Sequence, residues 1–269
     1  MVNKYARKYL YGALCYASHV EGAGTVAGSP YQHVEGKYNI NDDQNQYVHI
    51  VGAGTGVTNS AEAAAASLSN IHTLEWTGNA TYAGAITSST GADYAEYFEW
   101  EDGNPNNEDR VGLLVTIQGE KIRLANMGEE ILGVVSGTAA VIGDTAEWEW
   151  QEKYLRDKFG RVIWEPVEQF VEEYNEETGE TEKFSIGFIP QRKLNPNYDP
   201  EQEYVSRAKR KEWDTIGMLG KLHVIDDGSC KVGEYATVGL NGKAMISLSK
   251  TNMYVMKRID ETTILVLLK

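Results

Sequence analysis

Short runs of alternating apolar and polar residues dominate the second half of the chain, and this pattern predicts β-strands. Residues 110–143 form three such runs, which are separated by glycines. The breaks fall at Gly119, Gly128 and Gly137. Nearer the C-terminus, the sequences DDGS and LNGK have the composition of type I′ hairpin turns. The final two strands are expected to pair across residues 259–262.

Two further hairpins are predicted where turn residues separate alternating runs. The first is HTLEWTGNATYAGAIT, with TGN as its turn. Its buried face is expected to carry Leu74, Trp76, Tyr82 and Ile86. The second lies in the acidic run of residues 165–182, where EETGE is typical of a solvated hairpin tip. Since a lone hairpin is marginally stable in water, the first one needs neighbours, which other chains can supply.

Helical patterns are confined to two short segments. The run TNSAEAAAASLSN, residues 58–70, is either a short Ala-rich helix capped by Asn59 or Ser60, or a loop. Residues 151–159 predict a short helix or a turn. The predicted fold class is therefore mainly β, with one or two short helices.

A repeat near the N-terminus predicts a wound β structure. SHVEG (Ser18–Gly22) recurs 14 residues later as QHVEG (Gln32–Gly36), and a weaker copy, VHIVG (Val48–Gly52), follows after 16 more. Fixed spacing of this kind is typical of stacked β units, none of which buries its own apolar face. Because single windings bury little apolar area, the repeat predicts a homotrimeric β-roll or β-prism stalk.

Histidines occupy the same position in each copy of the repeat, at His19, His33 and His49. A metal site is one interpretation, but no carboxylate or second histidine lies at ligand spacing from any of them in the sequence. We therefore expect structural histidines that stack on one face of the repeat, and no metal.

Charge and composition limit the partners of the chain. The chain has a net charge of -14 and a pI of about 4.9, so nucleic acid and anionic membranes would repel it. No run approaches the roughly 18 apolar residues of a membrane helix, and the N-terminus lacks the apolar core of a secretory signal. Cys15 and Cys230 have no ligand neighbours and predict reduced thiols. We expect synthesis in the cytoplasm, with no nucleic acid or membrane partner.

The composition shifts near residue 92 and predicts a domain boundary there. Residues 1–92 carry four Lys/Arg and six Asp/Glu, so most of the negative charge lies beyond them. We interpret residues 1–57 as the β-repeat segment, 58–92 as a connector that includes the first hairpin, and 93–269 as a β-rich domain. Seven carboxylates crowd the boundary in GADYAEYFEWEDGNPNNEDRVG. Within it, EDGNPNNED is rich in turn residues and predicts a solvated loop without a catalytic role.

Several long blocks between Gly91 and Lys269 resemble a known family. They are GADYAEYFEWEDGNPNNEDRVGLLV, GVVSGTAAVIGDTAEWEWQEKYLRDKFGR, and NPNYDPEQEYVSRAKRKEWDTIGMLGKL followed by DDGSCKVG. In this order they resemble the C-terminal intramolecular chaperone domain of phage neck-appendage and tailspike proteins, the self-cleaving peptidase G2 family. The preceding repeats, with YVHIVGAGTG and SNIHTLEWTGNATYAG, resemble the stalks of trimeric phage fibres.

The resemblance implies the C-terminal part of a phage appendage, tail-fibre or tailspike protein, synthesised in the bacterial host. It implies a homotrimer with upstream fibre domains, in which this domain templates folding of the stalk and then cuts itself off. The stalk would belong to the virion. In the family the cut precedes an Asp, and a Glu three residues later is required. The matching residues are Asp93 and Glu96, which places the cut at Ala92–Asp93.

Two carboxyls can hydrolyse a peptide bond when one is ionised and activates water while the other protonates the leaving nitrogen. A close pair supplies both forms, because the two cannot stay ionised together. A helical turn would bring Asp93 and Glu96 together, whereas a strand would place them on opposite faces. A third arrangement takes the partner carboxylate from another chain. A rival acyl shift would use a hydroxyl of the segment 88–90, that is Ser88, Ser89 or Thr90, but no Lys or His base follows them.

A basic run, SRAKRKEW, stands out in this acidic domain. Arg207, Lys209 and Arg210 are candidates for a phosphate-bearing ligand or for salt bridges within or between chains. The resemblance extends to nucleotide binding by some members, but no GxxxxGK[ST] loop is present, so no cofactor is expected from the residues. Two alternatives are a non-catalytic trimerisation or adhesin tip, and a glycan hydrolase with paired acids.

Overall fold

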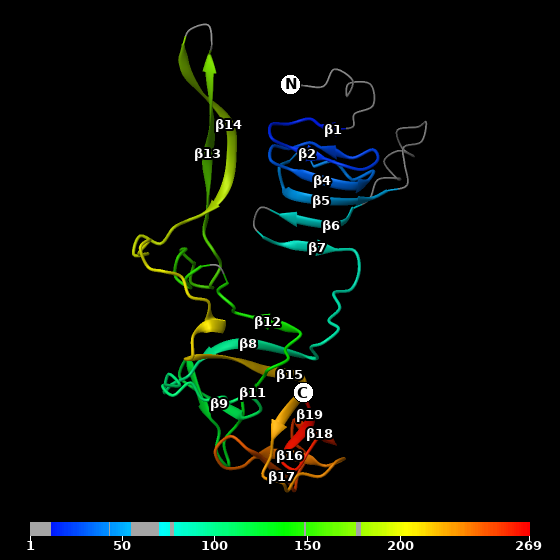
Figure 1. The fold of residues 1–269 in the computed structure, drawn as a ribbon, viewed down its shortest axis with the longest axis vertical. Coiled ribbons are helices and arrows are strands. Elements are labelled where there is room, and N and C mark those ends of the chain that lie inside the picture. Colours follow the sequence, from blue (N-terminus) through cyan, green and yellow to red (C-terminus); the bar gives the residue numbers. More distant parts are fainter. Residues whose placement is uncertain (1–11, 43, 55–69, 76–77, 148, 176–178) are drawn as a thin grey trace. The chain divides into compact units, whose positions relative to one another are not determined.

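Figure 1 shows the computed structural model of the chain, which describes residues 12–42, 44–54, 70–75, 78–147, 149–175 and 179–269. The chain divides into two compact units. One comprises Met1–Thr87 with Trp164–Arg192, and the other comprises Ser88–Ile163 with Lys193–Lys269. Nearly all regular structure in the described residues is β, which confirms the predicted fold class. The Ala-rich segment proposed as a helix or loop falls almost entirely outside the described residues.

The repeats wind as parallel β-strands. Strands β2 (His19–Val20), β4 (His33–Lys37) and β5 (Tyr47–Ala53) lie side by side, with His19 opposite His33 and His33 opposite His49. A second pair, β1 (Gly12–Ala13) and β3 (Val26–Ala27), is also parallel. Each winding returns to the equivalent position one repeat later, as the spacing of the repeats predicts.

The repeated glycine permits this close stacking. Gly36 has a φ of +92°, and a Cβ on it would lie 2.3 Å from the carbonyl oxygen of Gly52 in the next winding. Only glycine fits such an approach at a positive φ. Between the windings, Ala27, Val34 and Ile50 form a small buried core, so the repeat buries its apolar residues only by stacking.

The first predicted hairpin is present. Strand β6 (Asn70–Glu75) pairs antiparallel with β5, and β7 (Ala80–Tyr82) pairs antiparallel with β6. Its predicted buried face is wrong for Tyr82 and Ile86, which are 51% and 81% exposed, whereas Leu74 is half-buried. The reason is that β7 is the edge strand of this sheet in the described residues, and Ile86 lies beyond the end of β7. Trp76 lies outside the described residues.

The second predicted hairpin is also present and is long. It joins β13 (Trp164–Asn175) to β14 (Glu180–Arg192) in antiparallel register, with an irregularity between Gln169 and Phe170. Phe170, Phe184 and Phe188 are about half exposed or more on it. These two strands form a sheet of their own in the described chain.

The second unit is built on a ten-stranded sheet. Its strands are β8 (Asp93–Glu99), β9 (Leu114–Gln118), β10 (Lys121–Leu124), β11 (Gly133–Val135), β12 (Val141–Gly143), β15 (Trp213–Ile225), β16 (Tyr235–Val238), β17 (Ala244–Ser247), β18 (Met253–Arg258) and β19 (Thr263–Leu268). The long strand β15 is central, because it pairs with β8, β11 and β19. Two apolar clusters fill this unit, one around Leu114, Val224 and Val266 and one around Trp100 and Ile216.

Several predicted turns are confirmed in this unit. Gly119 separates β9 from β10, and the final hairpin pairs β18 with β19. The LNGK turn joins β16 to β17, and both Asn241 and Gly242 have positive φ, as a type I′ turn requires. The DDGS prediction is wrong, because only Gly228 has a positive φ there and the flanking strands β15 and β16 do not pair with each other.

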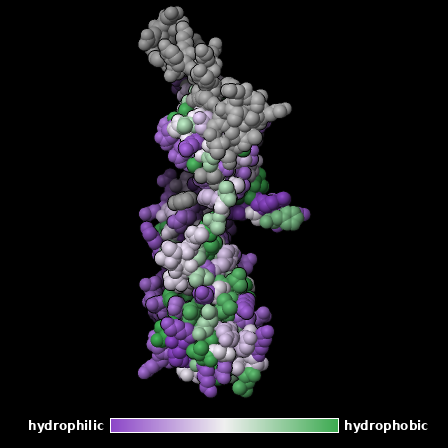
Figure 2. All heavy atoms as spheres, turned by 90° about the vertical axis from the view of Figure 1, so that its right-hand side faces the viewer, coloured by the Kyte–Doolittle hydropathy of each residue, from purple (hydrophilic) through white to green (hydrophobic). Residues whose placement is uncertain are grey.

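Helical structure is minimal in the described residues. Residues 151–159 form turns with isolated bridges, such as Arg156 to Val162, rather than a helix. The short helix η2 (Arg207–Lys209) is a single 3₁₀ turn. Among the described residues, no helix is both long and apolar enough to cross a membrane. On the face drawn in Figure 2, apolar and polar residues are interspersed.

Candidate functional site

The predicted scissile bond lies at the entrance to β8, which is held on both sides by other strands. β12 runs parallel to it and places Gly143 opposite Glu96. β15 runs antiparallel and places Gly220 opposite Asp93. Because β8 is extended, its side chains alternate: Asp93 and Ala95 are buried, Tyr94 is exposed and Glu96 is half-buried. Asp93 and Glu96 therefore lie on opposite faces within one chain, and the helical-turn arrangement does not form.

Asp93 is buried without a strong partner. Its side chain is 3% exposed, and neither carboxylate oxygen makes a hydrogen bond among the described residues. Burial raises the pKa of Asp93, and the nearby Ser136 hydroxyl and the residue's own backbone N–H oppose this shift only in part. A Cβ on Gly217 would lie 2.7 Å from Oδ2, so β15 closes directly over the carboxyl. These surroundings favour a neutral carboxylic acid, which can donate a proton.

The carbonyl of Ala92 is in contact with β15. The backbone N–H of Lys221 donates to the Ala92 oxygen at 3.3 Å. The preceding Gly220 has a φ of +115°, and a Cβ on it would lie 2.5 Å from the same oxygen. The pairing of β15 with β8 is irregular between Gly217 and Leu219, and such bulges are frequent beside active sites. A donor on a scissile carbonyl stabilises the negative charge that develops on its oxygen.

Glu96 faces an open depression of about 630 Å³, which Asp144 and Trp150 also line. Its Oε1 accepts a hydrogen bond of 2.5 Å from the Tyr94 hydroxyl, and this bond is the main reason that the pKa of Tyr94 is raised. Glu96 thus contacts Tyr94 and at the same time borders a depression that is open to solvent.

The hydroxyls of the rival acyl shift lie in an exposed segment. Ser88 Oγ accepts a hydrogen bond from the backbone N–H of Gly91 at 3.1 Å.

The basic run serves mainly the interior of its unit. Arg207 is 1% exposed, pairs with Asp144 at 2.6 Å, donates to Gln151, and lies 4.0 Å from the ring centre of Trp213. Arg210 pairs with Glu212 at 3.7 Å and stacks against two tryptophan rings. Lys209 is exposed. Arg207 is therefore engaged within the chain and is not presented to a ligand.

Arg110 was not singled out from the sequence, and it changes the picture of the acidic loop. Its guanidinium is 7% exposed, lies 4.3 Å from the ring centre of Trp100, and binds Asp102 through two hydrogen bonds of 3.0 and 2.6 Å. It also pairs with Glu108 at 2.9 Å. The Arg110 hydrogen bonds lower the pKa of Asp102. The loop is thus organised around a buried cation, and the single arginine within this acidic stretch was the available signal.

Comparison with known proteins identifies the family. The model of Peptidase_G2, IMC autoproteolytic cleavage domain, matches residues 23–262. The chain belongs to this family, the intramolecular chaperone domains that cleave themselves, and the match begins well before the expected Gly91. Self-cleaving peptidase activity is therefore the activity of this domain, as the resemblance in the sequence implied.

The relatives are phage proteins. The chain is 40% identical over 146 residues to the pre-neck appendage protein of Bacillus phage B103, covering 54% of this chain and 15% of that protein. It is 41% identical over 171 residues to the putative phage-related protein YobO of Bacillus subtilis strain 168, covering 62% and 19%. The chain thus spans less than a fifth of these relatives.

A solved structure has a similar fold. The pre-mature bacteriophage phi29 gene product 12 matches 96% of this chain and 34% of that chain, with a TM-score of 0.63 and 24% identity. This likeness supports the mainly β architecture, and it includes the part of the chain that precedes the site.

Proposed function

We propose that this chain is the C-terminal part of a phage appendage protein whose last domain drives homotrimerisation and folding of the stalk and then cuts the Ala92–Asp93 bond. The family match and the appendage relatives support the setting, with the stalk part in the virion. The exposed Tyr82 and Ile86 beside the last strand of the stalk supply apolar surface for neighbouring copies. The single observation that carries the catalytic assignment is the buried, unpaired carboxyl of Asp93 next to the bond.

In this proposal Asp93 is the general acid. Its carboxyl lies beside its own backbone nitrogen, which is the leaving group when the Ala92–Asp93 bond breaks. Glu96 is the general base that activates water, and the Lys221 N–H polarises the Ala92 carbonyl. Water adds to the carbonyl carbon, its proton passes to Glu96, and the Asp93 nitrogen leaves as an amine after taking the proton of the Asp93 carboxyl.

The two acids act on one bond only if Glu96 comes from another chain. Within one strand, three residues span about 10 Å, and an odd spacing places the side chains on opposite faces. Glu96 instead faces an open depression at the surface, where a segment of a second copy can enter. Cutting would then depend on assembly, which suits a domain that must finish folding the stalk before it leaves.

The test is complementation between two inactive chains of different mass. One carries Asp93→Asn and keeps Glu96, and the other carries Glu96→Gln and keeps Asp93. Each chain alone should stay intact on denaturing electrophoresis. When the two are co-folded, only the Glu96→Gln chain should be cut, and the new N-terminus should be Asp93 by N-terminal sequencing and intact mass.

Three outcomes separate the parts of the proposal. Absence of any cut in mixtures that co-assemble overturns the action of Glu96 across chains. A wild-type chain that stays whole after refolding overturns self-cleavage at this bond and favours the non-catalytic trimerisation tip. A folded wild-type monomer in sedimentation experiments overturns the trimer.

A further inference from the structure

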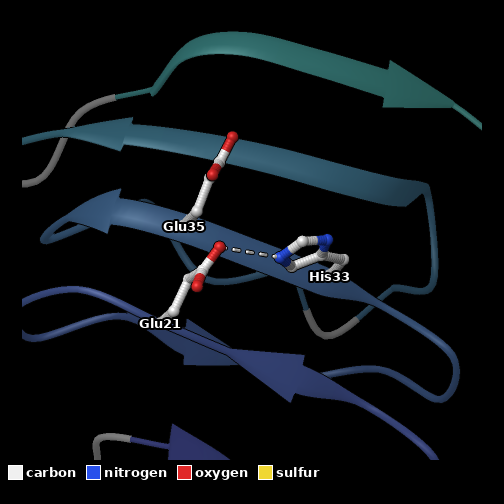
Figure 3. A group of neighbouring side chains, drawn as sticks. All are labelled: Glu21, His33 and Glu35. Atoms are coloured by element: carbon white, nitrogen blue, oxygen red, sulfur yellow. Dashed lines mark ion pairs between the residues drawn. The ribbon is translucent and has the colours of Figure 1, made fainter.

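The winding of the repeats places two glutamates around one histidine, as Figure 3 shows. Glu21 and the His33 ring point toward one another, whereas Glu35 lies beside them with its carboxylate directed toward the next winding. The expectation of no metal is not supported by the fold, because folding brings carboxylates to these histidines. Glu21 comes from the neighbouring winding, and Glu35 lies two residues along the same strand as His33.

The predicted histidine stack is present and forms the scaffold of this group. The rings of His19 and His33 are 4.9 Å apart and nearly parallel, and His49 follows at 5.2 Å. The row continues through His72 to Tyr82. The stack fixes the plane of the His33 ring and leaves its Nε2 directed at the Glu21 carboxylate.

The distances fit a shared cation better than a direct hydrogen bond. His33 Nε2 lies 3.5 Å from Glu21 Oε1, beyond the usual 2.7–3.2 Å of an N–H···O bond, and Nε2 has no hydrogen-bond partner among the described residues. Two ligands held about 2.1 Å from a tetrahedral zinc ion are themselves roughly 3.4 Å apart. The ligand atoms of Glu21, His33 and Glu35 all lie within 4.8 Å of one another, so small side-chain rotations bring the third into place.

The electrostatics of the repeat also favour a cation. His19 is opposite His33 in register, so Glu21 and Glu35 occupy the same position in successive windings. Like charges on neighbouring strands destabilise a sheet, and a divalent ion between them removes that repulsion. In the third copy Val51 replaces the glutamate, so Glu35 is the last carboxylate of the row.

We propose that Glu21, His33 and Glu35 bind a divalent transition-metal ion of the zinc class, with water completing the coordination. The ion would cross-link two successive windings of the stalk. The side chains of Glu21, His33 and Glu35 are 55%, 43% and 39% exposed, so an ion reaches the two carboxylates from solvent, whereas His33 Nε2 is itself covered and directed inward at the group. Glu35 Oε1 also lies 3.4 Å from His49 Nε2, so His49 competes with the proposed ion for this carboxylate.

The experiment uses the full chain, stripped with EDTA and dialysed. Co²⁺ is titrated while visible absorption is followed, and Zn²⁺ binding is measured by calorimetry. We expect one ion per chain. Glu21→Gln, Glu35→Gln and His33→Asn should each weaken Zn²⁺ binding at least about tenfold, because each removes a ligand whose interaction with the cation exceeds about 1.4 kcal/mol. Zn²⁺ should also raise the unfolding temperature of the wild-type stalk but not of these variants.

His72→Gln and His49→Asn are the matched controls. His72 belongs to the same stack but has no carboxylate of this group beside it, so its substitution should leave the affinity unchanged. Weaker binding on His49→Asn with no effect of Glu21→Gln would overturn the assignment to these three residues. Absence of Co²⁺ and Zn²⁺ binding to the wild-type chain would overturn the site itself. If His33→Asn disrupts the stalk in circular dichroism, the two glutamate variants, which alter only partly exposed side chains, decide the outcome.

Discussion

Replacing Asp93 with asparagine should stabilise the C-terminal unit at neutral pH, against the usual direction of substitutions in a buried position. Asp93 is 3% exposed, and its carboxylate has no hydrogen-bond partner among the described residues. Asparagine has nearly the same shape and no charge. The substitution therefore keeps the packing against Gly217 while it removes the penalty for a buried ionisable group.

The sign follows from the direction in which the pKa moves. Because burial raises the pKa of Asp93 above its unfolded value, this carboxyl favours the folded state fully at pH values below its unfolded pKa. That contribution is lost as the pH rises through the raised pKa. At neutral pH, each tenfold weakening of the acid by folding costs about 1.4 kcal/mol of stability. The amide of asparagine is itself buried, so we expect a net gain of about 1–2 kcal/mol.

The stabilities of the two chains can be compared only if neither chain cuts itself. Both the reference and the variant should carry Glu96→Gln, which lies on the other face of β8. Thermal unfolding followed by calorimetry should place the transition of the Asp93→Asn chain higher by about 2–4 °C for each kcal/mol gained. The difference should shrink as the pH is lowered toward 4, because the reference then keeps its own carboxyl neutral.

Asp226 is the matched control, since it is a buried aspartate of the same unit with the opposite surroundings. It is 1% exposed and binds Arg258 through hydrogen bonds of 3.1 and 2.7 Å. Burial acts to raise its pKa, but the Arg258 hydrogen bonds and the Cys230 N–H outweigh this, and the pKa of Asp226 is lowered. Asp226→Asn should therefore destabilise the unit by about 3 kcal/mol. If Asp93→Asn also destabilises by more than about 1 kcal/mol at neutral pH, the account of Asp93 as an unpaired buried acid is refuted.

Three further predictions concern Lys221, Arg207 and the two cysteines. The backbone N–H of Lys221 can be removed by replacing its amide with an ester, introduced as the α-hydroxy analogue of Nε-Boc-lysine. This change should slow the cut at Ala92–Asp93 by about 10²–10³-fold relative to a chain that carries Nε-Boc-lysine itself. An unchanged rate would contradict a role for this N–H. Arg207→Ala should lower the free energy of unfolding by about 3 kcal/mol in urea titrations, whereas Lys209→Ala should change it by less than about 0.5, and equal effects would count against the buried pair with Asp144. Burial is the first of the causes that raise the pKa of Cys230 to about 12, so iodoacetamide at pH 8 should label Cys15 of the folded chain well before Cys230, as judged by peptide mass mapping.

Local patterns predicted the elements whose determinants are local. Alternation and turn chemistry located the LNGK hairpin and the final β18–β19 hairpin, since both strands and the turn lie in one short stretch. The DDGS turn failed for the converse reason. The strand before this turn, β15, pairs with β19 near the end of the chain. The residues of a turn cannot indicate a pairing partner that lies so far away in the sequence.

The candidate site was harder to predict, because its residues violate the ordinary pattern. DYAEYFE has no clear apolar alternation, since the buried position is held by a charged residue type, Asp93. Departures of this kind are expected at functional sites. The carboxylates around His33, in contrast, were predictable: parallel windings 14 residues apart place Glu21 beside Glu35, with the histidine of the second copy between them.

The register of β8 determines how the proposed reaction is controlled. A helical turn would have placed both acids of one chain at the bond, and each chain could then cut itself as soon as that turn formed. The strand instead buries Asp93 against Gly217 and places Glu96 at an open depression, so in the proposed reaction one chain holds the acid and the bond but lacks the base. Burial of Asp93 requires β15 to be paired with β8, and these two strands are more than 100 residues apart in the sequence. The proposed cut therefore needs a folded unit to supply the acid and a second chain to supply the base, and either requirement alone prevents premature release of the stalk.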